Sequence, residues 1–310
     1  MVDLGGDSPL PLILLCGPTG SGKTALAVEL AAHFPLEVIS ADSRQIYRGM
    51  NIGTAKATST EREAVPHHLI DVVDPDEPFS VADFAEQAAK AVRQIVARRR
   101  LPLLVGGTGL YIRALTDGLL DAPAADENLR QTLNQQEDER PGSLHCELQR
   151  VDPTLAARLS PRDRIRIVRG LEVFRLGGIP LSRLQEEHGF SEKPYRTLHL
   201  LLSPEREDLY RRIDRRVELM FDEGLVAEAQ GLLAKGYPDT LKAFKTIGYR
   251  ESFALLRGEL DEGQVLEKIQ LETRRYAKRQ LTWFRKDNRL NVIDSLKEFG
   301  KIRKLIEHFF

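Results

Sequence analysis

The sequence of 310 residues has little cysteine and no long apolar run, and each shortage argues against a class of protein. Two cysteines, Cys16 and Cys146, support neither a disulfide framework nor a metal cluster, so we expect two reduced thiols in the core. No apolar run approaches the roughly 18 residues of a membrane span, and the N-terminus lacks the basic flank and cleavage site of a secretory signal. We therefore expect a cytoplasmic protein without a membrane partner.

The net charge is also close to zero, at −1. The fractions of hydrophobic residues, 42%, and of charged residues, 29%, are ordinary for a globular protein. This average hides two basic stretches. Residues 158–175 contain six arginines against two acidic residues, and residues 274–289 contain seven basic residues against one aspartate. A solvent-exposed helix face normally carries both positive and negative side chains. The excess of positive charge in these stretches therefore favours contact with a polyanion.

The most informative motif lies at residues 12–24. Five apolar residues at 12–16 predict a short buried strand, and the next eight residues match the phosphate-binding loop pattern G-x-x-x-x-G-K-T at every fixed position. In such a loop, glycines let backbone amides converge on phosphate oxygens, the lysine supplies charge and the threonine can hold a magnesium ion. Apolar residues at helical spacing over residues 25–34 predict the helix that follows. We therefore predict a phosphate site formed by Gly17, Pro18, Thr19, Gly20, Ser21, Gly22, Lys23 and Thr24.

A second strand, predicted at residues 37–41, ends just before four polar residues. Ligands of open α/β sheets bind at the C-terminal edge of the strands, so these polar residues should lie beside the phosphate loop. They are Asp42, Ser43, Arg44 and Gln45. The alternative, in which Asp42 only caps a turn, stays open from the sequence alone.

A third buried strand, predicted at residues 101–105, ends in glycine rather than in an acidic residue. An ATP-hydrolysing protein with this loop would place an acidic magnesium ligand there, so the NTPase interpretation loses support. We expect the glycines of residues 106–109 to let the backbone and the Thr108 hydroxyl approach a substrate closely. Residues 69–73 form another candidate strand, and residues 80–96 carry a capping box and an amphipathic helix.

From about residue 119 the composition becomes polar and helix-forming, and no strand pattern returns until residues 197–202. We predict an α/β core with a parallel sheet flanked by helices at residues 1–120 and 196–310, interrupted by an all-helical insertion at residues 121–195. The insertion should contain helices at residues 127–139, 144–150, 153–159 and 164–176.

After the insertion, two predicted helices carry basic residues. The helix at residues 206–219 has Arg212 and Arg216 one turn apart, a spacing that can clamp an anion, although nearby acidic residues also allow a salt-bridged surface. The helix at residues 262–286 carries the second basic stretch together with Tyr276 and Trp283.

Seven blocks of this sequence, spread from residue 12 to about residue 288, together resemble the bacterial-type tRNA dimethylallyltransferase family. The blocks are residues 17–24, 39–50, 51–56, 66–71, 104–111, 166–173 and 275–285. Asn51 stands where the family pattern has aspartate and Gly170 where it has alanine, and both departures leave the site motifs intact. No Cys/His zinc module follows the core, unlike in the eukaryotic relatives.

The resemblance implies a P-loop NTPase-like core that transfers a dimethylallyl group from its diphosphate to tRNA and releases diphosphate. The acceptor would be the exocyclic N6 amine of adenosine 37, just 3′ of the anticodon, in tRNAs that read codons beginning with U. By similarity, Asp42 is the general base and Thr108 helps to position it. Lys23, Thr24 with Mg²⁺, and Arg212 or Arg216 would neutralise the departing diphosphate.

The same resemblance implies that the basic insertion holds the anticodon stem-loop and that the adenine is flipped out of its stack into the site. No sequence feature demands a dimer, so we expect a monomer. The implied tRNA-binding residues are Asp42, Ser43, Arg44, Gln45, Thr108, Arg130, Arg166, Arg169, Lys245, Gly248, Tyr249, Arg250, Lys278 and Arg279.

Three other functions stay open. A transferase that prenylates free adenine nucleotides such as AMP or ATP would keep the loop, Asp42 and Thr108, but it would have little use for a large basic insertion. A P-loop small-molecule kinase should carry the missing acidic metal ligand. A non-catalytic RNA-binding module would explain the basic stretches and leave the phosphate loop without a role.

Overall fold

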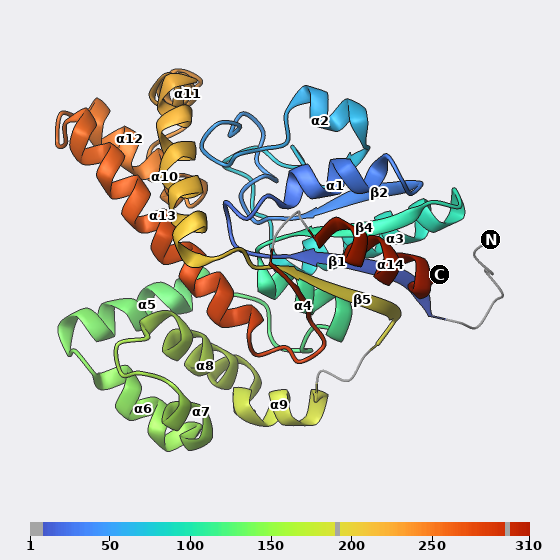
Figure 1. Cartoon of the computed structure of the whole chain (residues 1–310). Helices are drawn as coiled ribbons and strands as arrows, with labels where there is room; N and C mark the ends of the chain where they lie inside the picture. Colours follow the sequence, from blue (N-terminus) through green and yellow to red (C-terminus); the bar gives the residue numbers. More distant parts are fainter. Residues whose placement is uncertain (1–8, 190–192, 295–297) are drawn as a thin grey trace. The chain divides into compact units, whose positions relative to one another are not determined.

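The computed structural model describes residues 9–189, 193–294 and 298–310. The chain divides into two compact units, of which unit 1 comprises residues 1–116 and 193–310 and unit 2 comprises residues 117–192 (Figure 1). Within the described ranges, no helix is both long enough and apolar enough to span a bilayer.

Unit 1 is built on a six-stranded sheet in the order β3-β2-β4-β1-β5-β6, in which the paired strands run parallel. Helices flank the sheet on both faces, as Figure 1 shows, which confirms the predicted fold class. The strands are β1 (Leu10–Cys16), β2 (Leu36–Ala41), β3 (His67–His68), β4 (Leu101–Gly106), β5 (Tyr195–Leu202) and β6 (Asn291–Ile293).

The helices of unit 1 come from both of its chain segments. They are α1 (Lys23–Ala31), α2 (Ser59–Ala64), α3 (Val81–Ala97), α4 (Gly109–Asp117), α10 (Arg206–Asp222), α11 (Leu225–Ala234), the 3₁₀ helix η1 (Ala243–Lys245), α12 (Tyr249–Leu256), α13 (Glu262–Phe284) and α14 (Phe299–Phe309).

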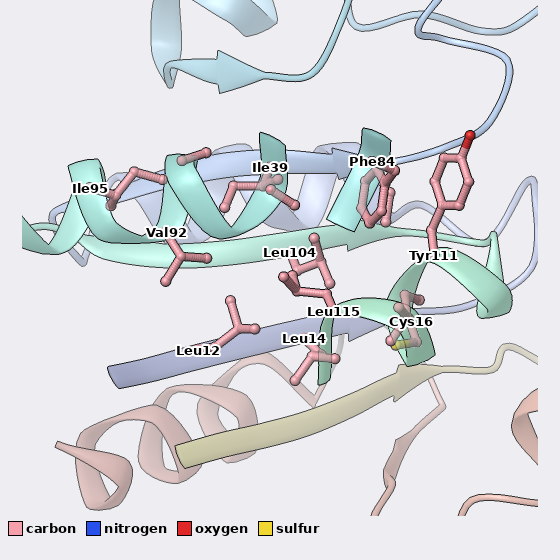
Figure 2. Packing of buried hydrophobic residues seen from close by; sticks show 14 of the residues in the cluster. Leu12, Leu14, Cys16, Ile39, Phe84, Val92, Ile95, Leu104, Tyr111 and Leu115 are labelled. Carbon is pink, nitrogen blue, oxygen red and sulfur yellow. The ribbon is translucent and has the colours of Figure 1, made fainter. Parts of the chain in front are cut away.

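Side chains of β1 alternate between the two faces of the sheet. Leu12 and Leu14 belong to the apolar cluster that α3 and α4 cover (Figure 2), while Ile13 and Leu15 pack with α1 and α14. Burial on both faces explains why β1 is an unbroken apolar run, and it fixes the point at which the phosphate loop leaves the sheet.

One prediction about the strands of unit 1 is wrong. Residues 69–73 are not a strand, because Leu69 and Asp71 adopt left-handed φ angles of 61° and 56°. Their loop is held by ion pairs of Asp71 with Lys56 and Arg62, which lie at 2.6 and 3.0 Å. Four apolar residues out of five therefore gave a false strand signal where the polar contacts of Asp71 hold the backbone.

Unit 2 is all-helical and has its own apolar core, in which Leu133, Leu148 and Leu171 are fully buried. Aspartates cap α5, α7 and α8 by accepting backbone N–H groups of the first turn. The helices are α5 (Glu127–Glu139), α6 (Ser143–Val151), α7 (Pro153–Arg158), α8 (Arg164–Gly177) and α9 (Leu181–His188). The second wrong prediction concerns Cys146 on α6, which is exposed, whereas Cys16 in β1 is buried as expected.

Candidate active site

A cavity of about 1230 Å³ lies in unit 1, beside the C-terminal ends of β2 and β4. The phosphate loop and the first turn of α1 line one part of it, and the turn after β2 lines another. Residues of α10 and α13 line further parts of the cavity. The cavity therefore brings together segments that lie up to about 260 residues apart in the sequence.

The phosphate loop takes the backbone shape that its glycines allow. Gly20 and Gly22 have φ angles of 81° and 95°, in the left-handed region that other residues avoid. A side chain at position 20 would also meet Ile213 of α10, whose Cγ1 would lie 2.9 Å from the added Cβ. Gly22 caps α1, so the first helical turn, beginning at Lys23, points its N–H groups toward the cavity.

The cations at this end of the cavity have neutral partners. The Lys23 ammonium donates to the carbonyl of Pro18 at 2.7 Å, and Nη2 of Arg216 donates to the Thr19 hydroxyl at 2.6 Å. Burial lowers the pKa of Lys23 to about 8, and burial also lowers the pKa of Arg216. The Arg216 Nε is buried without a hydrogen-bond partner. Two partly buried positive groups beside the N-terminus of α1 form a site suited to an anion.

Arg212, one turn before Arg216, is exposed at the rim of the same cavity. Its Nη1 lies 3.9 Å from the position that a Cβ of Gly22 would occupy, so it is close to the loop. The predicted arginine pair thus divides into Arg216, which is bound to the phosphate loop, and Arg212, which lies beside it.

Asp42 lies at the end of β2 and lines the cavity. Its Oδ1 accepts the N–H of Arg44 at 2.8 Å. This oxygen therefore caps the turn, as the alternative interpretation of Asp42 predicts. Within the described residues, Oδ2 of Asp42 makes no hydrogen bond, so its capacity to accept a proton or hydrogen bond is unused. The predicted neighbours Ser43 and Gln45 line the cavity as well.

Thr108 supports the Asp42 turn from the loop after β4. Its hydroxyl accepts the N–H of Ser43 at 3.1 Å, and its own N–H donates to the carbonyl of Ala41 at 3.2 Å. Thr108 itself is not among the residues that line the cavity. Tyr276 of α13, which the sequence did not single out as a site residue, does line it, and burial followed by the charge of Asp42 raises the pKa of its phenol to about 12.

The glycines of residues 106–109 make room for neighbouring protein groups, while Gly106 and Gly107 also line the cavity. A Cβ on Gly106 would lie 2.2 Å from the carbonyl oxygen of Ala41, and one on Gly107 would lie 2.1 Å from Nε2 of Gln280. A Cβ on Gly109 would lie 2.0 Å from the indole nitrogen of Trp283. Helix α13 therefore packs directly on the loop that carries Thr108.

The loop of residues 51–54 forms another part of the cavity wall, and a carboxylate of α11 fixes it. Glu228 accepts the N–H groups of Asn51 and Ile52 at 3.0 Å and the phenol of Tyr249 at 2.5 Å. Tyr249, one of the predicted tRNA-binding residues, has a fully buried side chain in this structure. Neither Glu228 nor its role was predicted, because the two segments lie about 175 residues apart.

The other predicted tRNA-binding residues of unit 1 divide between the cavity and the outer surface. Lys245, Gly248, Arg250 and Arg279 line the cavity, while Lys278 is exposed outside it. The guanidinium of Arg279 lies 5.7 Å from the centre of the Tyr276 ring.

In unit 2, two of the three predicted arginines share one buried carboxylate. Glu172 is fully buried and accepts Arg130 Nε at 2.8 Å, Arg169 Nη1 at 2.5 Å and the N–H of Asp126 at 2.8 Å. Burial opposes its ionisation, but the arginine hydrogen bonds outweigh this and hold the pKa of Glu172 below its usual value. Arg166 is different, since its side chain is 67% exposed and lies 3.4 Å from Asp163.

The residues at the phosphate loop fit a magnesium ion that is held partly by a ligand. Thr24 lines the cavity in the first turn of α1 and offers a hydroxyl oxygen. Across the described ranges, no cluster of three or more His, Cys, Asp or Glu side chains could hold a metal by itself. Magnesium commonly keeps several water ligands and takes phosphate oxygens as further ligands, so one threonine hydroxyl is enough as the protein ligand.

Comparison with known families shows to which protein family this chain belongs. The model of the IPP transferase family matches residues 45–287, and the isopentenyl transferase model matches residues 10–74. The chain belongs to the IPP transferase family. A tRNA dimethylallyltransferase of Syntrophotalea carbinolica is 54% identical over 98% of this chain and 97% of the relative, and one of Geobacter metallireducens is 51% identical over 96% and 97%.

Solved structures of this family have the same fold. The tRNA isopentenylpyrophosphate transferase of Bacillus halodurans superposes with a TM-score of 0.70 at 40% identity, covering 96% of this chain and 94% of that one. A eukaryotic dimethylallyltransferase acting on tRNA superposes with a TM-score of 0.78 at 29% identity, covering 92% and 74%. The predicted resemblance and the P-loop NTPase-like fold are thereby confirmed.

Proposed function

We propose that this IPP transferase moves a dimethylallyl group from dimethylallyl diphosphate to the N6 amine of adenosine 37, beside the anticodon of tRNA. Full-length relatives that are named tRNA dimethylallyltransferases support the activity. One observation carries the proposal at residue level: the phosphate loop and Asp42 line the same cavity. A donor held by its diphosphate would thus share a space with a carboxylate that can take up the amine proton.

In the proposed reaction, the bond between the allylic carbon and the diphosphate oxygen breaks and a bond between N6 and that carbon forms, by a concerted displacement or through an allyl cation. The adenine amine is a weak nucleophile because its lone pair is delocalised into the ring. Asp42 would accept the proton that the amine loses, through the oxygen that is not committed to Arg44. Thr108 would act indirectly, by holding Ser43 in the turn that carries Asp42.

The diphosphate gains charge as it leaves, and the loop end of the cavity is suited to that change. Lys23 and Arg216 lack carboxylate partners within the described residues, so their charge is available to an anion. Thr24 would hold magnesium together with diphosphate oxygens and water. The bound ion would stabilise the charge that develops on the leaving group.

For the acceptor, we propose that exposed cations of both units contact tRNA phosphates. Arg166 in unit 2, and Lys278, Lys245 and Arg250 in unit 1, keep exposed side chains and are the best candidates. The adenosine would have to leave its stack to enter the cavity, at a cost of a few kcal/mol. Because tRNA is the acceptor, we also propose a cytoplasmic location, while the monomeric state stays a prediction.

The proposal can be tested by incubating the pure protein with labelled dimethylallyl diphosphate, Mg²⁺ and one acceptor at a time. We expect label in bulk tRNA, located on adenosine 37 after nuclease digestion, and none in AMP or ATP. Labelling of AMP or ATP without tRNA would favour the adenine-nucleotide isopentenyltransferase. Phosphate transfer from ATP to a small molecule, with no prenyl transfer, would favour a kinase.

A further inference from the structure

Helix α13 carries a buried polar but uncharged side chain, Gln280, inside its basic stretch, and this side chain reaches the cavity wall. Its Oε1 accepts the N–H of Thr19 at 2.9 Å, and its Nε2 donates to the carbonyl of Gly107 at 3.0 Å. The orientation of the amide follows from its partners, since a backbone N–H can only donate and a carbonyl can only accept.

The first partner belongs to the donor side of the cavity. Thr19 lies in the phosphate loop, and its hydroxyl accepts Nη2 of Arg216 at 2.6 Å. Gln280 therefore holds the backbone of the same residue whose side chain holds the desolvated arginine. A displacement of Thr19 would move both the loop and Arg216.

The second partner belongs to the acceptor side. Gly107 directly precedes Thr108, whose hydroxyl holds the N–H of Ser43 next to Asp42. The contact is tight, because any side chain at position 107 would place its Cβ 2.1 Å from Nε2 of Gln280. One amide group thus joins the loop that faces the diphosphate to the loop that supports the base.

We infer that Gln280 is a positioning residue that fixes the distance between the bound diphosphate and the Asp42 turn. The inference rests on the proposed transferase function, in which the leaving oxygen, the carbon and the amine must lie in line. Geometric errors near 1 Å can cost about 10²-fold in rate, so a loose connection between the two loops would lower the rate of transfer.

Glutamine suits this position because it offers one acceptor and one donor at once. Ionised glutamate would keep the bond to Thr19 but would turn a second acceptor toward the carbonyl of Gly107. Protonated glutamate has both an acceptor and an O–H donor, so it would restore the connection. The charged side chains that line the same cavity near these loops are Lys23, Asp42, Arg44, Arg212, Arg216 and Arg279, and the titratable phenol of Tyr276 lines it as well.

The test compares Q280M and Q280E with wild type in single-turnover transfer at saturating donor and tRNA. We expect Q280M to be about 10- to 100-fold slower, with donor and tRNA Kd values changed by less than about threefold. We expect Q280E to be slow at pH 8 and to recover relative to wild type as the pH falls toward 5.5. Dividing by the wild-type rate at each pH removes the titration of Asp42.

Gln270 provides the matched control on the same helix. Its Nε2 also donates to a backbone carbonyl, that of Asp214 at 3.4 Å, but it does not line the cavity. We expect Q270E to keep a constant, near-wild-type rate ratio across the pH range. A Q280M rate within twofold of wild type, or a Q280E ratio that does not change with pH in a protein that melts normally, would overturn the inference. Failure of wild type to prenylate tRNA would instead overturn the proposed function.

Discussion

The cavity of unit 1 and the helical unit 2 both contain many charged groups, but they use them differently. Among the residues that the structure describes, one oxygen of Asp42 in the cavity makes no hydrogen bond, and Lys23 donates only to a backbone carbonyl. In unit 2, Glu172 is saturated by Arg130 and Arg169. Charges with unused hydrogen-bonding capacity are available for a ligand, whereas charges that saturate one another mainly hold the fold. The count of basic residues in a sequence does not distinguish these two cases.

The largest effect should come from Asp42→Asn, the test of the unsaturated carboxylate. General-base assistance is typically worth about 10²- to 10⁴-fold, or roughly 3 to 5.5 kcal/mol of barrier, so the single-turnover rate should fall by about that factor. Affinities for donor and tRNA should change by less than about tenfold, because the shape is nearly kept.

A melting curve provides the control for this variant. If Asp42 served only the turn to Arg44, the variant would lose about 1 kcal/mol of stability and keep most of its rate. A stable variant within a few-fold of the wild-type rate would remove Asp42 from the mechanism.

Glu172→Gln tests the saturated carboxylate and should act on stability instead of rate. Removing the charge takes the carboxylate away from Arg130 and Arg169, whose side chains are 30% and 33% exposed, so we expect a loss of about 1 to 3 kcal/mol of stability. In wild type, the lowered pKa of Glu172 stabilises the fold above the unfolded pKa of about 4.3, and this contribution is lost as the pH falls through the folded pKa.

Chemical denaturation of wild type and variant between pH 3 and pH 7 measures both effects. The two stability curves should converge at acid pH, because protonation neutralises the wild-type carboxyl. Parallel curves would show that the charge of Glu172 does not stabilise unit 2.

Lys23 should make donor binding sensitive to pH. Because the pKa of Lys23 is about 8, a growing fraction of the protein molecules carries a neutral Lys23 above that pH. These molecules must take up a proton when the anionic donor binds. Donor affinity should therefore weaken by up to about tenfold per pH unit beyond 8. Below about pH 7 the ammonium is already charged, and this contribution to the pH dependence should vanish.

Titration calorimetry at pH 8.5 in two buffers of different ionisation enthalpy counts the protons taken up. Lys23→Met should bind donor more weakly and show no proton uptake from this group, while its tRNA affinity stays near that of wild type. Equal proton uptake by wild type and variant would assign the titration to another group.

The smallest effect is expected for Arg166→Ala, which tests an exposed cation of unit 2. Loss of one phosphate contact should weaken tRNA binding by a few-fold and reduce the slope of log K against log salt concentration by about 0.9 or less. Stability should change by less than about 0.5 kcal/mol, because the side chain is 67% exposed.

Arg130→Ala is the matched comparison, since it removes a partner of the buried Glu172. Filter binding over a range of salt concentrations, with melting curves, separates the two variants. If Arg166→Ala leaves both the affinity and the salt slope unchanged, this arginine does not contact the acceptor.

Local sequence patterns predicted much of the fold and part of the site. The phosphate loop, its strand and its helix were predicted because their residues are neighbours in sequence, and four helices of unit 2 were placed within one or two residues. Contacts between distant segments were not predictable: Gln280 meets Thr19 across 261 positions. The burial of Tyr249 and its hydrogen bond to Glu228, in another helix, were not predictable for the same reason. The sequence feature that could have drawn attention to Gln280 is that it is an uncharged polar residue within a basic helix.

The order of the strands has a consequence for how this chain folds during synthesis. β1 pairs along its whole length with β5, so the sheet cannot close around the phosphate loop until residue 202 has been made. Synthesis from residue 16 to residue 202 takes roughly 10 to 40 s at the usual ribosomal rate. Unit 2 ends at residue 192, before β5 is complete, so this unit can begin to fold before the loop that precedes it in sequence. The first motif of the chain is thus among the last parts of unit 1 to reach its native surroundings.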